Sequence, residues 1–366
     1  MKNKKIVIFI SKLQGGGAEL TAVDLANFIA KKGYVVDLIS IKKNKEKKIL
    51  NKNINLINLN CSRLIFSIPK LFFYMFKNNS SKLFFVSFLN GNNLISIILK
   101  IFFKNINLTC TIHNPISNHF KFTTFKDKLI IYMLLMLKNV PNKYVVCSNY
   151  IKKELVASYG FDKRKIMNIY NPIDFQKISR KSKKQNYFLK KLKKKNKILI
   201  SVGRLEYQKN YSSLILKLKK LLISRNIVFI ILGTGTEFNY IKELINKNKL
   251  KDKVFLLGYK LNPYSYLKYS DLFILNSRWE GLGNVLVESL FLRVPIICNE
   301  CPGGINEIFE NKKNKSVFNF ENQKKLERSI INSLYKKKKF SFNEKILKKF
   351  NFKKTSNEYL KFILNR

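Results

Sequence analysis

Residues 197–232 have the sequence KILISVGRLEYQKNYSSLILKLKKLLISRNIVFIIL, and this stretch decides the fold class. An apolar run, Ile198–Val202, is followed by Tyr211–Ser224, whose apolar residues recur at helical spacing. A second apolar run, Ile227–Leu232, comes next. A strand, a helix and a strand in this order predict a β-α-β unit, with parallel strands that helices cover on both faces.

The same alternation runs along both halves of the chain. Further strands are expected at Val254–Leu257, Leu272–Leu275 and Val294–Cys298, and before them at Ile6–Ser11, Val35–Ile41, Leu83–Phe88, Leu108–His113 and Tyr144–Ser148. Because the series restarts at Lys197, and 366 residues are enough for two cores, we expect two α/β domains. The predicted divisions are an N-terminal domain over 1–175, a Lys-rich linker over 176–196, a C-terminal domain over 197–345 and a C-terminal helix over 346–366, with a return of that helix to the first domain as one option.

The charge balance is strongly basic. Lysine and arginine number 71 against 22 acidic residues, which gives a formal net charge of +49. Such a surplus attracts nucleic acid, an anionic membrane surface or phosphorylated substrates, and a compositional bias towards Lys, Asn and Ile is the alternative for part of it. The lysines are spread along the chain and no nucleic-acid-binding motif occurs, so we expect an anionic membrane surface and no specific nucleic acid. A basic nucleic-acid-binding protein is the alternative class.

The cysteines and the longest apolar stretches limit the location. Five cysteines at irregular spacing do not form a disulfide framework, which favours a reducing cytoplasm. Cys298 and Cys301 form one C-x-x-C with no second pair, so packing around a loop is expected rather than metal or redox chemistry. The apolar stretches Leu64–Phe76 and Leu94–Phe103 each contain a lysine and are shorter than the ~20 residues of a spanning helix. We therefore expect a soluble or peripheral protein.

The strongest local motif for chemistry is Ser277–Leu290, with the sequence SRWEGLGNVLVESL. It follows a predicted strand, passes a glycine turn and enters a helix. Ligands of open α/β sheets bind beyond the carboxyl ends of the strands, and the free N–H groups of a helix start suit a phosphate. Glu280 lies on the loop and Glu288 about one turn into the helix, so they could hold different parts of one ligand. A glutamate near a helix start is also favourable to the helix dipole alone.

The spacing of Glu280 and Glu288, with Gly281 and Gly283 between them, resembles the paired-glutamate motif of glycosyltransferase family 4. Four other segments resemble family segments in the expected order: residues 12–19, residues 198–210, Leu232-Gly233-Thr234-Gly235 and Leu257-Gly258-Tyr259. The resemblance implies an α/β fold called GT-B, in which two Rossmann-like doubly wound domains face each other across a cleft. It also implies transfer with retention of the anomeric configuration, as in bacterial surface-polysaccharide and lipid-linked glycan enzymes.

The resemblance also implies the site residues. The catalytic ones are Glu280, His113, Arg204 and Lys209. The donor-binding ones are Gly16, Gly17, Arg204, Lys209, Gly258, Tyr259, Glu280, Gly283, Asn284, Val285 and Glu288, with Gly15, Asn306 and Glu307 as secondary candidates. Arg204 and Lys209 would stabilise the charge that grows on the leaving phosphate. Glu280 would bind sugar hydroxyls, Glu288 the ribose and His113 the donor sugar. By position alone, Arg204 and Lys209 are also consistent with solvated surface side chains, and His113 with a core histidine. Leu282 stands where the family often has Phe, which leaves both carboxylates in place.

The expected reaction moves a hexose or N-acetylhexosamine from a nucleotide sugar, with UDP favoured, to a saccharide acceptor that is lipid-linked, in polysaccharide, lipopolysaccharide or glycan assembly. The nucleotide sugar is a co-substrate, and no cofactor is expected. No Asp-x-Asp motif occurs, so no metal requirement is expected. GDP-mannose-dependent mannosyl transfer and nucleotide-sugar epimerisation are the alternatives on the same fold. The apolar and basic stretch Phe66–Lys77 favours a peripheral location on the inner face of the cytoplasmic membrane, or belongs only to acceptor-domain helices.

Overall fold

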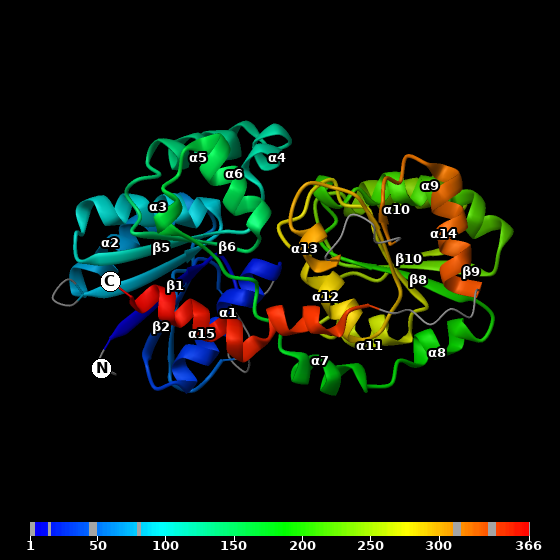
Figure 1. The fold of residues 1–366 in the computed structure, drawn as a ribbon, viewed down its shortest axis with the longest axis horizontal. Coiled ribbons are helices and arrows are strands. Elements are labelled where there is room, and N and C mark those ends of the chain that lie inside the picture. The colour runs from blue at the N-terminus through cyan, green and yellow to red at the C-terminus, as the bar shows by residue number, and fades with distance from the viewer. Residues whose placement is uncertain are drawn as a thin grey trace. The chain divides into compact units, whose positions relative to one another are not determined.

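The computed structural model describes residues 4–13, 16–43, 50–78, 82–309, 316–335 and 342–365, and its chain divides into two compact units (Figure 1). The first unit comprises Met1–Pro172 together with Phe352–Arg366, and the second comprises Ile173–Asn351. The chain therefore leaves the first unit once and returns to it with its last helix.

The first unit is built on a parallel sheet. In chain order its strands and helices are β1 (Lys5–Ile10), α1 (Gly17–Lys31), β2 (Val35–Ser40), β3 (Ile54–Asn58), the 3-10 helix η2 (Leu64–Ser67), α2 (Ile68–Lys77), β4 (Leu83–Phe88), α3 (Asn90–Phe102), β5 (Ile106–Ile112), α4 (Ile116–Lys121), α5 (Phe125–Met136), β6 (Lys143–Val146), α6 (Asn149–Tyr159), the 3-10 helix η3 (Lys163–Lys165), β7 (Ile166–Asn168) and α15 (Phe352–Leu364). The strand order is β3-β2-β1-β4-β5-β6-β7, and every neighbouring pair is parallel.

Continuous apolar strands place the core of this unit on both faces of its sheet. Ile6–Ile10 of β1 are fully buried, as expected of a strand covered on both sides. Alternate residues of β1 pack against the apolar face of α1, which includes Leu25 and Ile29. Tyr359 and Ile363 of the returning helix α15 complete the same cluster, which is why the last helix belongs to the first unit.

The second unit repeats the design. Its elements are α7 (Phe175–Ser182), α8 (Tyr187–Lys193), β8 (Lys197–Val202), the 3-10 helix η4 (Tyr207–Lys209), α9 (Tyr211–Ser224), β9 (Ile227–Leu232), α10 (Phe238–Lys247), β10 (Val254–Leu256), α11 (Pro263–Tyr269), β11 (Leu272–Leu275), α12 (Asn284–Phe291), β12 (Ile296–Asn299), α13 (Ile305–Phe309), β13 (Val317–Phe318), α14 (Gln323–Tyr335) and the 3-10 helix η5 (Glu344–Phe350). The parallel strands run in the order β10-β9-β8-β11-β12-β13.

The core of the second unit follows from the stretch that predicted it. Leu199 of β8 and Phe229 of β9 are fully buried and pack with Leu214 and Leu218 of α9. Leu326 and Ile330 of α14 close the cluster from the far end of the unit's sequence. The predicted strand–helix–strand is confirmed within a residue or two at each end.

Both sheets reverse their order at an inner strand, between β1 and β4 in the first unit and between β8 and β11 in the second. In such doubly wound sheets the crevice for a ligand lies outside the carboxyl ends of the two strands that flank this point. The fold therefore points to the loops after β8 and β11, and to those after β1 and β4, before any side chain is considered.

Three short strands were not predicted, and the linker was misassigned. β3, β7 and β13 lie away from the reversal points, at or next to sheet edges, and β3 is only partly buried. The stretch 176–196, expected as an exposed linker and lead-in helix, carries most of α7 and all of α8 and belongs to the second unit. Ile178 and Leu189 are buried on one side of these helices, so the Lys-rich stretch forms two short amphipathic helices.

Candidate active site

Two loops meet at the reversal point of the second sheet. Gly203–Lys209 follow β8, and Asn276–Gly283 follow β11. Both strands end at the same edge, so the side chains of the two loops converge although about 70 residues separate them along the chain. This convergence brings together the two loops that carry four of the predicted donor-binding residues: Arg204, Lys209, Glu280 and Gly283.

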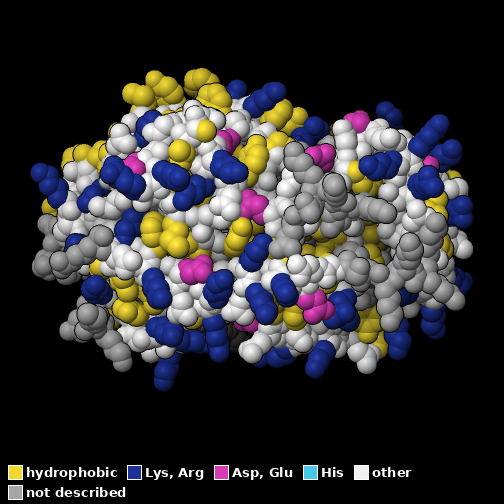
Figure 2. All heavy atoms as spheres, in the orientation of Figure 1, with side chains coloured by type: hydrophobic (Ala, Val, Ile, Leu, Met, Phe, Trp, Pro, Cys, Tyr) yellow, Lys and Arg dark blue, Asp and Glu magenta, His cyan; other side chains and the backbone are white. Residues whose placement is uncertain are grey.

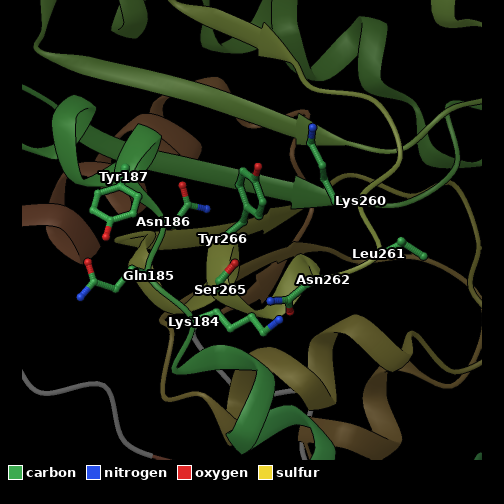
Figure 3. A pocket seen from close by; sticks show the side chains of 9 residues that line it. All are labelled: Lys184, Gln185, Asn186, Tyr187, Lys260, Leu261, Asn262, Ser265 and Tyr266. Atoms are coloured by element: carbon green, nitrogen blue, oxygen red, sulfur yellow. The ribbon is translucent and has the colours of Figure 1, made fainter.

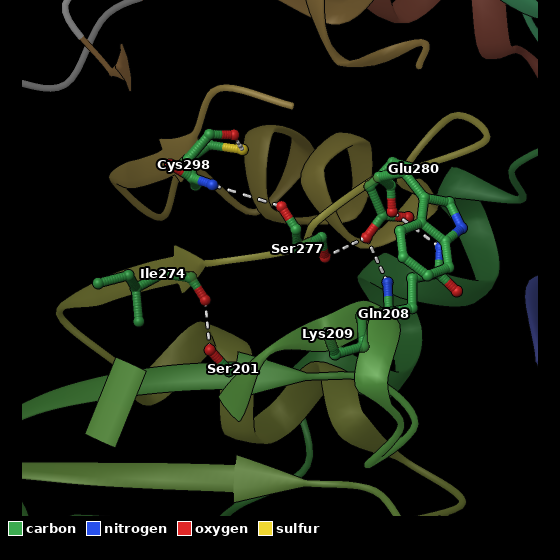
Figure 4. Close-up of polar contacts among 9 residues, drawn as sticks. Ser201, Gln208, Lys209, Ile274, Ser277, Glu280 and Cys298 are labelled. Atoms are coloured by element: carbon green, nitrogen blue, oxygen red, sulfur yellow. Dashed lines mark hydrogen bonds and ion pairs between the residues drawn. The ribbon is translucent and has the colours of Figure 1, made fainter. Parts of the chain in front are cut away.

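The Glu280 carboxylate is the centre of this region (Figure 4). Its Oε1 accepts a hydrogen bond of 2.5 Å from the Ser277 hydroxyl and forms an ion pair with the Lys209 ammonium. The Glu280 side chain is 6% exposed and that of Lys209 15%, so the pair is largely withdrawn from water. Both contacts go to Oε1, and neither goes to Oε2. The structure thus brings two of the four predicted catalytic residues into direct contact.

The backbone of Glu280 is clamped by the loop before α13. Glu280 N–H donates to the Pro302 carbonyl at 2.9 Å, and Gly304 N–H donates to the Gly281 carbonyl at 3.0 Å. Gly303 lies between them with a φ of +127°, and a Cβ atom there would come within 1.6 Å of the Glu280 carbonyl oxygen. Only glycine permits this approach, so the loop through Gly303 fixes the position of Glu280.

A second set of contacts ties the two loops together. The Gln208 side-chain amide donates to the Trp279 carbonyl at 2.8 Å, and Arg278 N–H donates to the Gln208 carbonyl at 2.8 Å. Asn210, at φ +53°, accepts from the Arg278 guanidinium at 2.8 Å. Sequence reasoning gave no role to Gln208, Asn210 or Ser277. All three lie inside the two stretches it quoted, but nothing in one sequence pairs the stretches with each other.

Arg204 differs from Lys209 in its surroundings. It lies in the turn directly after β8, it is exposed, and no hydrogen bond or ion pair of its guanidinium is found within the described residues. Close backbone packing supports this turn. Gly233 N–H donates to the Gly258 carbonyl at 2.9 Å, and a Cβ on Gly233 would come within 1.8 Å of the Gly203 carbonyl oxygen.

The remaining candidates of the second unit surround this point less tightly. Gly283, at φ +88°, precedes α12, so Asn284 and Val285 form its first turn and Glu288 follows on the next, half-buried. Tyr259 is 44% exposed beyond β10, two strands away from β8. Asn306 and Glu307 lie in the short helix α13.

Burial and the Glu280 charge set the ionisation of nearby groups. Burial, and then the charge of Glu280, raises the pKa of the Tyr211 phenol and that of the Cys301 thiol. Burial, followed by Cys301 and then Glu280, also raises the pKa of the Cys298 thiol. Both cysteines are free and buried. Neutral thiols are poor nucleophiles, and a buried free cysteine packs as a small apolar side chain.

The other candidates belong to the first unit. Gly16 and Gly17 lie at the start of α1, where the Glu19 carboxylate accepts from Gly16 N–H at 3.0 Å. Gly15 lies outside the described residues. His113 follows β5, stacks on Phe88 with ring centroids 5.5 Å apart, and has Nε2 3.0 Å from the Thr111 hydroxyl oxygen. Burial lowers the pKa of His113 to about 4, so the ring is neutral at pH 7.

A separate cavity of about 320 Å³ lies on the α7–α8 side of the second unit (Figure 3). Lys184 and Asn186 line it from one segment, and Lys260, Asn262 and Tyr266 from another. None of the predicted site residues lines this cavity.

Within the described residues no helix is both long and apolar enough to cross a bilayer.

Two doubly wound parallel sheets are the architecture of the GT-B glycosyltransferases. The chain belongs to the glycosyltransferases: residues 15–177 match the model for Glycosyltransferase Family 4, and residues 182–346 match the model for Glycosyl transferases group 1. The predicted fold class and enzyme class are therefore confirmed.

Individual relatives carry more specific names. The chain is 29% identical over 324 residues to a Campylobacter jejuni N-acetylgalactosamine-N,N'-diacetylbacillosaminyl-diphospho-undecaprenol 4-alpha-N-acetylgalactosaminyltransferase, over 84% of this chain and 83% of the relative. It is 28% identical over 203 residues to an Escherichia coli UDP-Gal:alpha-D-GlcNAc-diphosphoundecaprenol alpha-1,3-galactosyltransferase, over 53% and 52%. Among solved structures, Anabaena HepE in complex with UDP and glucose superposes with a TM-score of 0.80 at 17% identity, over 98% of this chain and 99% of that one.

Proposed function

We propose that the chain is a retaining glycosyltransferase that moves a hexose or N-acetylhexosamine from a UDP-sugar to a saccharide carried on a lipid diphosphate. The observation that carries the donor-binding part of this proposal is the ion pair of Glu280 and Lys209 at the reversal point of the second sheet, with Arg204 exposed in the turn directly after β8. UDP is favoured because it occupies the structurally similar HepE and appears in the name of the Escherichia coli relative.

The two cations have separate duties in this proposal. Negative charge grows on the diphosphate when the bond to the sugar breaks, and fixed cations lower the energy of that state. Arg204 is exposed at the end of β8 and is available to the diphosphate as it stands. Lys209 is already held by Glu280, so its ammonium is oriented before the donor arrives. The amides that begin α12 after Gly283 add partial positive charge on the other side.

Glu280 binds the sugar in this proposal. Ser277 and Lys209 both occupy Oε1, so Oε2 is the oxygen that accepts from a sugar hydroxyl. The Gly303 clamp keeps the carboxylate in place, and such orientation is worth several kcal/mol when reacting groups must align. Glu288, one turn into α12, takes the ribose hydroxyls. Two protein cations acting on the diphosphate make a divalent metal unnecessary, so transfer is expected to persist in a chelator.

A lipid-linked acceptor is supported by the diphosphoundecaprenol in the names of both relatives. Such an acceptor is presented at a membrane, which agrees with the net charge of +49. We propose that the chain binds the anionic inner leaflet of the cytoplasmic membrane through its first unit.

The first unit has a surface suited to this role, here called the docking face. It consists of the exposed apolar side chains on or beside α2, α3, α4 and α5: Phe73, Phe76, Ile101, Phe102, Phe120, Phe122, Phe125, Leu129, Tyr132, Met133 and Met136. These helices are neighbours, since α3 packs against both α2 and α5, and α5 against α4. Phe125 is 84% exposed and Met136 68%. Exposed large apolar side chains gathered in this way indicate a binding surface.

Lysines are interleaved with these apolar groups. Lys77 lies 4.5 Å from the ring centre of Phe73, and Lys121 lies 5.3 Å from that of Phe122. Hydrophobic side chains gather over α5 with basic ones beside them (Figure 2). Apolar side chains enter the interface while lysines meet anionic headgroups, which is how peripheral proteins bind membranes. The predicted stretch Phe66–Lys77 supplies only one edge of this face.

Thermal unfolding with UDP, GDP, ADP and CMP tests the donor site. A ligand at ~100 times its dissociation constant that binds only the folded state adds about 2.7 kcal/mol of stability. We expect a shift with UDP that Arg204→Ala weakens. Arg225→Ala is the matched control, because Arg225 is exposed at the opposite, amino-terminal edge of the sheet. A shift with none of the nucleotides, or equal shifts in both variants, would contradict the assignment.

Flotation with phosphatidylglycerol vesicles at low salt tests the docking face. Each buried aromatic or Met side chain is worth ~1.5–3 kcal/mol, so the double variant Phe125→Ser/Met136→Ser should bind at least about tenfold more weakly. The control is Tyr187→Ser/Phe188→Ser on α8, whose side chains are 74% and 41% exposed. Absence of wild-type binding, or equal loss in the control, would count against this surface.

A further inference from the structure

One nitrogen of the His113 ring makes a polar contact, and the other nitrogen is buried without a hydrogen-bond partner among the described residues. Nε2 lies 3.0 Å from the Thr111 hydroxyl oxygen. Nδ1 is buried and has no hydrogen-bond partner among the described residues. Buried polar atoms without partners are rare in proteins, and each one calls for an explanation. The explanation depends on which of the two nitrogens carries the proton.

The Thr111 hydroxyl decides between the two forms of the ring. Its single proton is donated to the Ser87 carbonyl oxygen on the neighbouring strand, at 2.9 Å. A hydroxyl has one proton and two lone pairs, so Thr111 can only accept from His113. The Nε2 atom must therefore carry the proton. The opposite form would break the bond to Ser87 and would leave a buried N–H at Nδ1 with no acceptor, which is the worse outcome.

The surroundings hold the ring in this state. Ser87 and Thr111 lie on the paired strands β4 and β5, where Phe88 is opposite Thr111, so the hydroxyl and its acceptor belong to the rigid sheet. The Phe88 ring stacks on the imidazole with an interplanar angle of 19°. Asn93 also donates to the Thr111 carbonyl at 2.8 Å, which fixes the end of β5. Since burial lowers the pKa of His113 to about 4, the ring is also neutral at pH 7.

We propose that Thr111, through its bond to the Ser87 carbonyl, is a positioning residue that fixes His113 as the Nε2–H tautomer and reserves Nδ1 as an acceptor for a donor-sugar hydroxyl. The tautomer follows from contacts within the first unit alone. The sugar hydroxyl as partner rests on the proposed function. In this neutral form of His113 only the lone pair of Nδ1 is unused. The ring can therefore accept a hydrogen bond from a hydroxyl at Nδ1 but cannot donate a proton from that atom.

Nitrogen-15 NMR of histidine-labelled protein tests the tautomer directly, because the chain contains only two histidines. The variant His119→Asn assigns the His113 signals, and this substitution lies outside the proposed site. In the free protein we expect Nε2 to show the protonated, pyrrole-type shift and Nδ1 the unprotonated, pyridine-type shift. Thr111→Ser keeps the hydroxyl and should keep this pattern. Thr111→Val removes the acceptor, and a mixture of both tautomers should appear.

Three results would overturn the proposal. One is a wild-type protein whose proton is on Nδ1, and this is measured even if Thr111→Val does not fold. Another is a folded Thr111→Val protein with the wild-type spectrum. The third is a UDP-sugar that binds by thermal shift but leaves the Nδ1 resonance unmoved, where an accepted hydrogen bond should shift it. If no UDP-sugar binds at all, the proposed function fails while the tautomer is still decided by the spectrum of the free protein.

Discussion

Replacing Lys209 by methionine tests two roles of this residue: stabilising the buried Glu280 carboxylate and binding UDP. The side chains of Lys209 and Glu280 are only 15% and 6% exposed, and without the ammonium the carboxylate keeps just the Ser277 hydroxyl. Removing one partner of a buried ion pair costs about 3–5 kcal/mol, because the other charge remains buried. Ser277 still satisfies Oε1 and Lys209 is not fully buried, so we expect the lower end, about 3 kcal/mol.

Thermal unfolding measures this cost. In a unit of about 180 residues each kcal/mol moves the midpoint by about 2–4 °C, so Lys209→Met should unfold about 6–12 °C below the wild type. Arg204→Met is the matched control from the same loop, since the exposed Arg204 should change stability by no more than about 0.5 kcal/mol. The double variant Lys209→Met/Glu280→Gln should recover most of the loss, because it leaves no unpaired charge.

Both single variants should weaken UDP binding although only one destabilises the fold. A stabilising role of the buried ion pair is refuted if Lys209→Met unfolds within about 1 °C of the wild type, or if Arg204→Met lowers the unfolding midpoint as much as Lys209→Met does. It is also refuted if the double variant is less stable than Lys209→Met, because the buried charge would then not be the cause.

Three further predictions concern other parts of the chain. Gly303→Ala should lower the free energy of unfolding in urea by about 3 kcal/mol or more, since its Cβ would collide with the Glu280 carbonyl. Gly258→Ala, at φ +69° with no atom within 4 Å of the new Cβ, should lower it by only about 1–2 kcal/mol. Equal losses in the two variants would contradict the close approach of Gly303 to Glu280. Tyr74→Phe removes a 2.5 Å bond to the buried Asp37 carboxylate and should cost about 1.5–3 kcal/mol, while Tyr132→Phe, 56% exposed, should cost nothing measurable. The pKa of His113 falls from 6.5 to about 4 on folding, so between these pH values only the unfolded chain binds a proton at this residue. The free energy of unfolding, measured in urea, should therefore decrease by up to about 3 kcal/mol as the pH falls from 6.5 to 4. His113→Asn should remove this contribution to the pH dependence of stability.

The sequence predicted the interior strands because their apolar runs are continuous. Ile227–Leu232 and Leu83–Phe88 are buried along their whole length, so composition alone identifies them. β3 is half-buried at a sheet edge and β13 has two residues, so neither carries that pattern. The stretch of α7 and α8 was predicted as an exposed linker with a lead-in helix, because one short buried side does not outweigh the lysines around it.

The site was predictable residue by residue but not contact by contact. Glu280, Arg204 and Lys209 were singled out from strand ends and from a resemblance, and their individual roles stay predictions. The ion pair between Lys209 and Glu280 spans 71 positions, and only the parallel order of β8 and β11 brings it together. The approach of Gly303 to the Glu280 backbone also depends on the three-dimensional fold. Local sequence patterns indicate which residues are candidates for the site. The order of the strands in the sheet determines which of these residues contact one another.

Sugar transfer from a UDP-sugar to a lipid-linked saccharide is measured in a single assay. Purified protein is incubated with labelled UDP-sugars and a saccharide on undecaprenyl diphosphate, with Glu280→Gln beside the wild type and a chelator in a parallel reaction. We expect label in the lipid-soluble product with release of UDP, unchanged by the chelator and strongly reduced in Glu280→Gln. Label that never enters the lipid-linked product, with UDP-sugars that nonetheless bind, would contradict this transfer.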